Sequence, residues 1–150
     1  MQINKESNFR IKLPNDELRH PVDTKTKAEF EFIGEKLIAI RGVTTIEADS
    51  KEEIEKASIE LFGEIMSVNG LEEESLVSLQ ITTTEDIRAY YPATALRLNG
   101  CKIPLFSSLE PSIKNSMPKC IRYLVLAYSS EKASHVYLKG AKDLIKRDCC

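Results

Sequence analysis

The clearest pattern of apolar and polar positions lies between residues 50 and 70. Ser50 and Glu53 form a Ser-x-x-Glu capping box, which is typical of a helix start because both side chains can bond to backbone N–H groups of the first turn. Apolar residues then recur at helical spacing along one stripe, namely Ile54, Ala57, Leu61, Ile65 and Val68. Asn69-Gly70 supplies a typical helix end. The pattern predicts one long amphipathic helix.

The residues before this helix predict a strand and a hairpin. Phe30 and Phe32 alternate with glutamates, and a second apolar run follows a turn, at residues 37–40. This pattern favours a hairpin whose loop spans residues 33–36. The alternative is that the preceding residues cross to another subunit. Residues 1–36 are therefore interpreted as an N-terminal arm, partly disordered or carrying an added hairpin strand.

After the long helix the period changes to that of a strand. Alternation of apolar and polar residues from Val77 predicts a strand over residues 77–84, which ends in three threonines. The last of them, Thr84, can start one helical turn with its two acidic neighbours. Pro92 can begin a second short helix that stops at Asn99-Gly100.

The C-terminal half predicts three further strands. Pro104 places a brief strand over residues 102–106 at the edge of a sheet, or bends it. A loop with at most one helical turn follows over residues 107–118, and two closing strands are predicted at 119–128 and at about 135–144. Together with the helices, these elements indicate an α+β fold of about five strands, one long helix and one or two short ones.

The predicted strand at 119–128 has a further consequence. It is apolar on both faces apart from Arg122, so both faces need cover. One long helix and a short one can cover only one face of the sheet. The other face is therefore predicted to meet another subunit, which favours a homo-oligomer.

Two arginines stand beside or inside apolar runs. Arg122 is unusual in a strand of this kind, because a guanidinium cannot lose its charge and an unpaired charge is costly in an apolar interior. Arg41 follows the first apolar run directly. Since arginine forks suit carboxylates, each residue either pairs with an internal acid or binds a carboxylate of a ligand. Arg88 lies in a polar segment and is interpreted as a surface residue.

The composition is typical of one globular domain, with 150 residues of which 42% are hydrophobic and 29% charged. The formal net charge of -2 gives no electrostatic reason to expect nucleic acid or an anionic membrane as a partner. No window approaches the run of about 18 apolar residues that spans a bilayer. Residues 1–30 hold several acids and no apolar block, so neither a secretory signal nor a transit peptide is expected. The predicted location is the cytoplasm.

The residue types that bind zinc do not occur at zinc-ligand spacing. The chain has four cysteines and two histidines, which are Cys101, Cys120, Cys149, Cys150, His20 and His135. None of the cysteines forms a C-x-x-C pair, and the histidines are far apart. Cys101 and Cys120 are predicted to be reduced and interior, and residues 147–150 to form a frayed tail. His135 is interpreted as a surface or turn residue.

Five short segments resemble, in order and at similar spacing, those of the AroH-class chorismate mutases. They are IRGVTT (40–45), YPATALR (91–97), PLFSSLE (104–110), KCIR (119–122) and HVYLKGA (135–141). The similarity extends from about residue 37 to residue 144 and includes the long helix. It implies a domain over residues 37–146 with a mixed five-stranded sheet. It also implies a homotrimer packed around a central axis, with active sites in clefts between neighbouring subunits.

The reaction of that family is the Claisen rearrangement of chorismate to prephenate, which leads to phenylalanine and tyrosine. This unimolecular rearrangement uses no covalent intermediate, proton transfer, metal or cofactor, so the resemblance implies that no cofactor is needed. Catalysis then depends on holding the dicarboxylate in its compact reactive shape and on stabilising the charge that separates in the transition state. Such a reaction explains why the sequence has no catalytic triad, metal cluster or glycine-rich phosphate loop.

The resemblance implies roles for four residues in particular. Arg122 resembles the central cation, which donates to the ether oxygen of the breaking bond and touches a carboxylate. Arg41 resembles the carboxylate-binding arginine, and Tyr137 the tyrosine whose hydroxyl assists it. Glu110 resembles the acid that binds the ring hydroxyl and balances the cationic cleft. Without the order of the segments, Tyr137 reads as a half-buried strand tyrosine and Glu110 as a solvated loop residue.

The full set of substrate-binding positions implied by the resemblance is Arg41, Tyr91, Ala93, Thr94, Arg97, Leu105, Phe106, Ser107, Glu110, Arg122, Tyr137 and Leu144. Of these, Tyr91 and Ala93 would form an apolar wall that comes from the adjacent subunit, and Arg97 would approach the open side of the cleft. Leu105, Phe106 and Leu144 fit positions that line it.

Some positions depart from the family pattern. Thr94 stands where lysine is common, and Ser107 replaces a cysteine, although a serine can still donate and accept. Tyr91 replaces phenylalanine, and Glu85 occupies the usual proline position. Ile145 falls where an arginine is expected, with basic residues at 146 and 147 as alternatives. These departures bear on substrate affinity more than on the chemistry.

Two other functions remain open from the sequence. The first is a non-catalytic trimeric module of the same fold, in which the cleft binds a small carboxylate for regulation. The second is an enamine-hydrolysing trimer of similar architecture, whose diagnostic residues do not coincide with KCIR or YPATALR.

Overall fold

The computed structural model describes residues 34–146. The hairpin strand predicted around Phe30 and Phe32, and the tail predicted at residues 147–150, lie outside the described residues. The domain boundaries at residues 36 and 146 stay predictions.

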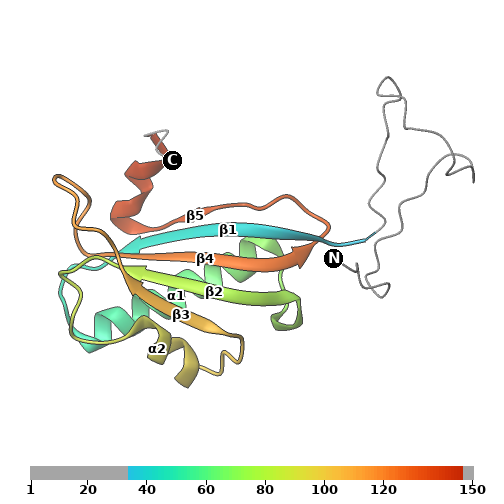
Figure 1. Cartoon of the computed structure of the whole chain (residues 1–150), viewed down its shortest axis with the longest axis horizontal. Helices are drawn as coiled ribbons and strands as arrows, with labels where there is room; N and C mark the ends of the chain where they lie inside the picture. Colours follow the sequence, from blue (N-terminus) through green and yellow to red (C-terminus); the bar gives the residue numbers. More distant parts are fainter. Residues whose placement is uncertain (1–33, 147–150) are drawn as a thin grey trace, which may run out of the picture. The chain divides into compact units, whose positions relative to one another are not determined.

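A mixed five-stranded sheet forms the centre of the fold (Figure 1). Its strands are β1 (Lys36–Thr45), β2 (Leu76–Thr83), β3 (Leu105–Leu109), β4 (Cys120–Ser129) and β5 (Val136–Tyr137), in the order β3-β2-β4-β1-β5. The central strand β4 pairs antiparallel with β1 and β2, whereas β3 pairs parallel with β2 and β5 pairs parallel with β1. The predicted α+β class with a mixed sheet is confirmed.

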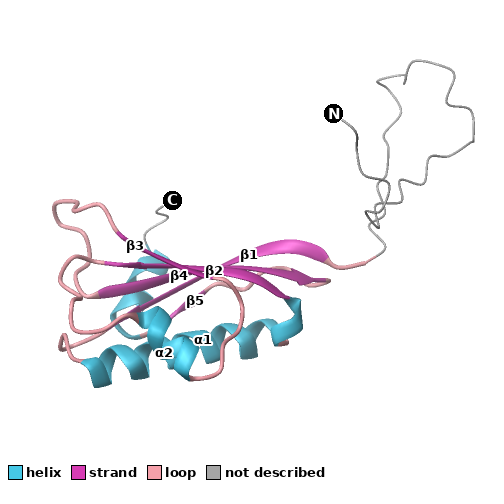
Figure 2. Cartoon of the chain, turned by 60° about the horizontal axis from the view of Figure 1, so that its bottom comes forward, coloured by secondary structure: helices cyan, strands magenta, loops and turns pink. Residues whose placement is uncertain are grey.

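The two α-helices lie on the same side of this sheet (Figure 2). They are α1 (Lys51–Asn69) and α2 (Pro92–Leu98), and two 3-10 helices accompany them, η1 (Glu73–Ser75) and η2 (Lys139–Lys146). Within residues 34–146, no helix is long and apolar enough to cross a membrane. The core lies between the sheet and the helices, where Ile40, Ile54, Leu61, Ile65 and Val125 are fully buried.

The start and end of α1 follow the prediction in part. The Ser50 hydroxyl accepts a hydrogen bond from the Glu53 N–H at 3.3 Å, and Gly70 ends the helix with a left-handed backbone (φ 58). The Glu53 carboxylate does not return to Ser50, however. It accepts from the N–H groups of Glu47 and Ala48 at 2.8 and 3.0 Å, which lowers its pKa and closes the loop between β1 and α1.

The apolar stripe of α1 is confirmed at its first four positions and wrong at the fifth. Val68 is 50% exposed. The last turn of the helix faces the loop before β5 rather than the sheet, and Asn69 is the residue turned towards the protein. Its amide bonds to both backbone groups of Ser134, at 2.9 and 2.7 Å.

Gly42 allows β1 and α1 to pack closely. A Cβ at this position would overlap the side chain of Ile65 and lie 3.2 Å from Cδ1 of Leu61. Only glycine therefore lets the helix lie directly on this part of the strand.

Strand β2 departs from simple alternation at its first residues. Leu76 pairs with Ala127 and Ser78 with Leu126, so the register shifts between them. This irregularity turns Val77 out to solvent and Leu76 into the core, so Val77 does not share the buried face of Leu79 and Ile81, with which it alternates in the sequence.

The brief strand predicted around Pro104 is confirmed at the edge of the sheet but spans β3, residues Leu105–Leu109. Pro104 itself lies before the strand, where its carbonyl accepts from the Leu79 N–H at 3.0 Å. The predicted turn at Thr84 is confirmed by a 3.1 Å hydrogen bond from the Ile87 N–H to the Thr84 carbonyl.

The strand predicted at about 135–144 is wrong for most of its length. Strand β5 covers only Val136–Tyr137, and the chain then turns into η2. Lys139 takes a left-handed backbone (φ 49), and the N–H of Gly140 donates to the hydroxyl of Thr45 at 3.1 Å. These local features end the ladder and carry the chain across β1.

Candidate active site

The two faces of the sheet differ in how they are covered. Along β4, residues 121, 123, 125 and 127 are buried beneath the helices. The alternate residues Arg122, Leu124, Leu126 and Tyr128 point to the other side, where Leu124 is 37% and Tyr128 48% exposed. Within the described residues, the uncovered face predicted from the sequence is therefore present.

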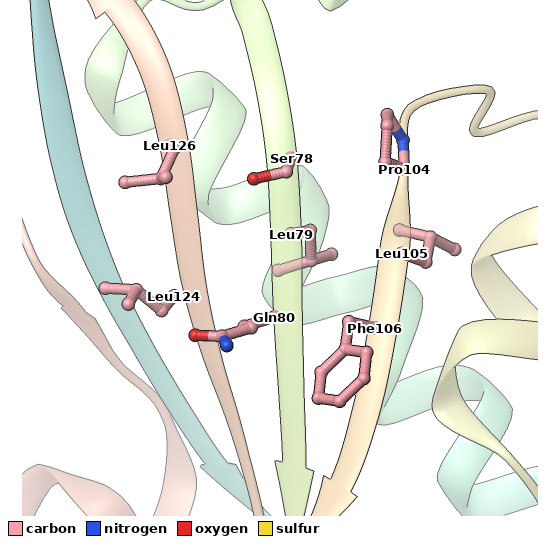
Figure 3. A pocket seen from close by; sticks show the side chains of 8 residues that line it. All are labelled: Ser78, Leu79, Gln80, Pro104, Leu105, Phe106, Leu124 and Leu126. Carbon is pink, nitrogen blue, oxygen red and sulfur yellow. The ribbon is translucent and has the colours of Figure 1, made fainter.

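This surface is called the open face below. Its members are Leu37, Ala39 and Arg41 of β1, Ser78, Gln80 and Thr82 of β2, Phe106 of β3, and Arg122, Leu124, Leu126 and Tyr128 of β4. A groove of about 300 Å³ lies on it, between Gln80, Phe106, Leu124 and Leu126 (Figure 3).

One row across the sheet brings predicted site residues together. Arg122 pairs with Thr82 of β2 on one side and with Val43 of β1 on the other, and Val43 pairs with Tyr137 of β5. Arg122 and Tyr137 thus share a face and lie two strands apart, about 10 Å at ordinary strand spacing. Arg41 lies two residues before Val43, on the same face of β1.

Arg122 meets an acid of its own chain. Its Nη1 forms an ion pair with Oε2 of Glu110, the residue directly after β3, and the other oxygen of that carboxylate accepts from the Thr82 hydroxyl at 2.6 Å. The Arg122 and Glu110 side chains are 33% and 12% exposed. The expectation of an arginine sunk in an apolar interior is therefore corrected. Because this face of β4 is uncovered, the guanidinium is half-buried, and an internal acid already balances it.

A small apolar cluster closes one end of the open face. Val43, Cys120 and Ala141 are buried there, and Met117, Tyr137 and Leu144 pack against them. Two predicted site residues, Tyr137 and Leu144, therefore lie together near Arg122, held by β5 and η2. Burial raises the pKa of the Cys120 thiol to about 11, so this thiol stays protonated near neutral pH. Cys101 and Cys120 are free and buried, as predicted.

Arg41 is exposed, and its guanidinium has no hydrogen-bond or ion-pair partner within residues 34–146. Its backbone N–H donates to Nδ1 of His135 at 3.1 Å, one residue before the β1–β5 pairing begins. The interpretation that Arg41 pairs with an internal acid is therefore not met in the described part of the chain. His135 is exposed, as predicted, but it supports the backbone of β1.

Helix α2 lies on the helix side of the sheet (Figure 2), whereas Arg122 points to the other side of β4; Tyr91 directly precedes this helix. Tyr91 is 70% exposed, Thr94 is also exposed, and Ala93 packs against the main core. The Arg97 guanidinium donates to the carbonyls of Cys101 and Ile103 at 2.7 and 3.1 Å, which ties down the connection from α2 to β3. The chain by itself does not bring these residues to Arg122, and their arrival from a neighbouring subunit stays a prediction.

The three candidates on β3 separate in the same way. Phe106 pairs with Gln80 and belongs to the open face. Leu105 and Ser107 pair with the core residues Leu79 and Ile81, so they face the helix side of the sheet. Ile145 is exposed at the position where an arginine was expected.

Sequence reasoning missed the side chains that hold the entry to β4. Both carboxylate oxygens of Asp86 accept from the Lys119 N–H, at 3.1 and 2.9 Å, and Lys119 has a left-handed backbone (φ 50). The Thr84 hydroxyl donates to Asp86 and accepts from the Cys120 N–H at 2.9 Å. Threonine and aspartate two residues apart are typical of turns, but nothing local indicates the partner near residue 119. Thr82 gave no local signal either.

Comparison with known proteins identifies the family. The family model described as chorismate mutase type I matches residues 37–148. The chain belongs to this family. Its members include the chorismate mutase AroH of Thermus thermophilus, 36% identical over 107 residues that cover 68% of this chain and 88% of the relative. The AroH of Bacillus subtilis (strain 168) is 32% identical over 105 residues, covering 67% and 83% respectively.

A solved structure supports the assignment. The chorismate mutase from Clostridium thermocellum superposes with a TM-score of 0.68 at 36% identity, over 70% of this chain and 97% of the other. The resemblance found in the sequence is confirmed, and membership of the type I family implies an enzyme with chorismate mutase activity. It favours the enzyme over both the binding module and the enamine hydrolase.

Proposed function

We propose that this chain converts chorismate to prephenate beside the Arg122–Glu110 pair, in a cleft that a neighbouring copy of the chain completes. The observation that supports this location of the site is the open face of the sheet. Arg122 of β4, its acid Glu110 directly after β3, and Arg41 of β1, which has no side-chain partner among the described residues, reach the same surface. The proposal places the reaction in the synthesis of aromatic amino acids. A cytoplasmic location and the lack of a cofactor stay predictions.

The chemistry requires positioned charge rather than acids and bases. As the ether C–O bond lengthens, negative charge develops on its oxygen, and a guanidinium donor aimed at that oxygen stabilises the transition state more than the ground state. Arg122 contacts Glu110 through Nη1 alone, and its Nη2 and Nε have no partner within residues 34–146. Those two groups are the donors that the proposal assigns to the ether oxygen and the adjacent carboxylate.

The second carboxylate is assigned to Arg41, whose guanidinium is unpaired within the described residues. A planar fork can bind a carboxylate through two parallel hydrogen bonds, which fixes the orientation of the substrate. Tyr137, on the same face as Arg122, is assigned to assist it. Glu110 is assigned to the ring hydroxyl, since each carboxylate oxygen can accept more than one hydrogen bond.

A neighbouring subunit is assigned the remaining wall. The open face exposes Leu37, Phe106, Leu124 and Tyr128, and monomeric proteins rarely leave such apolar surface contiguous and uncovered. We infer a homotrimer in which these faces meet. In it, the next copy presents Tyr91 and the α2 residues Ala93, Thr94 and Arg97 to the cleft, which explains why the single chain keeps them away from Arg122.

The test is an assay of chorismate turnover by the purified chain and by Arg122→Ala. Removing one donor to a developing oxyanion costs about 100- to 1,000-fold in kcat, so the variant is expected to fall by that amount. Circular dichroism and sedimentation serve as controls, and both are expected to match the unmodified chain. Turnover by Arg122→Ala at the normal rate would remove Arg122 from the site. If chorismate rearranged no faster with the unmodified chain than without protein, the proposed activity itself would be rejected.

A further inference from the structure

Thr82 occupies a special position beside the proposed site. It lies on β2 directly opposite Arg122 of β4, on the open face, and its side chain is half-buried. Neither composition nor spacing drew attention to it, and none of the roles proposed above involves it. Its hydroxyl donates a hydrogen bond to Oε1 of Glu110 at 2.6 Å.

Glu110 is thereby held at three points. Its backbone N–H donates to the Thr83 carbonyl at 2.9 Å, which fixes the chain at the end of β2. One carboxylate oxygen accepts from Thr82, and the other meets Nη1 of Arg122. The two oxygens therefore have different partners, and the plane of the carboxylate is set by residues on two adjacent strands.

This division of partners matters for Arg122. A carboxylate that is free to turn can pair with a guanidinium through both oxygens at once, which is the favoured fork-to-fork geometry. Such a pair would use two of the Arg122 donors and leave fewer for a ligand. In the structure Oε1 is turned to the Thr82 hydroxyl, and Arg122 contacts Glu110 through a single nitrogen, at Oε2.

We propose that Thr82 is a positioning residue of the rearrangement, which turns the Glu110 carboxylate so that the fork of Arg122 stays available to the substrate. This inference rests on the function proposed above. Thr82 touches no reacting atom, and it acts through Glu110. Its loss is therefore expected to lower kcat, because the donors of Arg122 matter most as charge develops, and to leave KM less affected.

The experiment compares five variants with the unmodified chain. Thr82→Val removes the hydroxyl at nearly constant shape, whereas Thr82→Ser keeps it. Thr83→Val is the matched control, because the Thr83 side chain points to the other face of β2 and its hydroxyl has no partner within residues 34–146. Glu110→Gln and the double variant Thr82→Val/Glu110→Gln complete a double-mutant cycle. Kinetics with chorismate and calorimetry with prephenate are measured for each protein.

Hydrogen bonds to charged groups predict a loss of about 10- to 100-fold in kcat for Thr82→Val. Thr82→Ser is expected within about threefold of the unmodified chain, and Thr83→Val unchanged, on the same reasoning about the hydroxyl. In the Glu110→Gln background, Thr82→Val is expected to add less than about twofold, because the two residues act as one unit.

Three results would overturn the proposal. They are normal turnover by Thr82→Val while Glu110→Gln is impaired, equal losses in Thr82→Val and Thr82→Ser, and a full loss from Thr82→Val in the Glu110→Gln background. If the unmodified chain shows no turnover, the proposed function is rejected independently of the role of Thr82. The binding of prephenate then tests whether Thr82 positions Glu110. Weaker prephenate binding by Thr82→Val than by Thr82→Ser supports the positioning role of Thr82, and equal binding by the two variants contradicts it.

Discussion

At the scale of single residues, Thr44 stands out because its hydroxyl is fully buried and has no hydrogen-bond partner among the described residues. Its neighbour Thr45 points to the other face of β1 and accepts a hydrogen bond from the Gly140 N–H at 3.1 Å. The two threonines have the same intrinsic preference for a strand. Replacing each of them with valine therefore compares the cost of an unpaired buried hydroxyl with the stability that a hydrogen-bonded hydroxyl contributes.

Thr44→Val is therefore expected to raise the free energy of unfolding by about 1 kcal/mol, since it replaces an unpaired buried hydroxyl with a methyl group of similar size. Thr45→Val is expected to lower the same quantity by about 1 kcal/mol, because it removes the hydrogen bond that the Thr45 hydroxyl accepts from the Gly140 N–H. Urea unfolding of both variants measures the difference. A loss of stability in Thr44→Val would show that its hydroxyl has a partner, such as an ordered water.

The site was predicted from the sequence only as a set of residues, and its contacts were not. The partner of Arg122 is 12 residues away in the chain, and the Thr82–Glu110 hydrogen bond spans 28 residues. Both contacts are set by the parallel pairing of β3 with β2 and the antiparallel pairing of β2 with β4. Because no local pattern specifies which strands become neighbours, Thr82 could not be singled out, and the sequence left open whether Arg122 pairs with an internal acid or with a carboxylate of a ligand.

At the scale of elements, the packing of α1 on β1 depends on the absence of a side chain at Gly42, where an added Cβ would overlap Ile65. A second glycine provides a contrast. Gly63 lies within α1, and an added Cβ there would meet no atom of the described residues within 4 Å.

Gly42→Ala is expected to lower the free energy of unfolding by about 1–3 kcal/mol, because overfilling a packed interface forces side chains or backbone to move. Gly63→Ala is expected to raise it by about 0.5–1 kcal/mol, because alanine favours an exposed helix position over glycine. Thermal and urea unfolding of the two variants check the opposite signs. A neutral Gly42→Ala would mean that Ile65 can move aside at little cost.

The elements that the sequence predicted correctly are those with complete local signals. Helix α1 has a cap at Ser50, a regular apolar stripe and Gly70 at its end. The predicted length of strand β5 was wrong because the end of this strand depends on the left-handed backbone of Lys139 and on the hydrogen bond between Gly140 and Thr45, which lie 95 residues apart in the sequence. The outward orientation of Val77 could not be predicted for a related reason. A bulge arises from the pairing of two strands and not from the sequence of one strand alone.

At the scale of the whole molecule, the open face and the exposed α2 residues lie on opposite sides of the sheet. If the proposed trimer is correct, one active site takes Arg122 from one copy and Tyr91 from the next. Two inactive variants should then complement each other when they share a trimer.

Arg122→Ala removes the central cation, and Tyr91→Glu places a repelling carboxylate at a position that is 70% exposed in the single chain. Each alone is expected to be inactive. After the two are unfolded together and refolded at equal amounts, about one quarter of the sites would combine an intact Arg122 with an intact Tyr91. Turnover is measured for the mixture and for each variant refolded alone. No recovery in the mixture, with both proteins sedimenting as trimers, would contradict a site shared between subunits.

Strand β1 carries two sets of residues in alternation. Ile40, Gly42 and Thr44 face the helices, whereas Arg41 and Val43 face the other side. Inserting or deleting one residue ahead of Arg41 would exchange the two sets, so that a charge would enter the core and Gly42 would leave α1. Substitutions at single positions of β1 can be tolerated one at a time. An insertion or deletion of an odd number of residues within this strand cannot. Among related chains, we therefore expect gaps to fall in the loops and to spare residues 36–45.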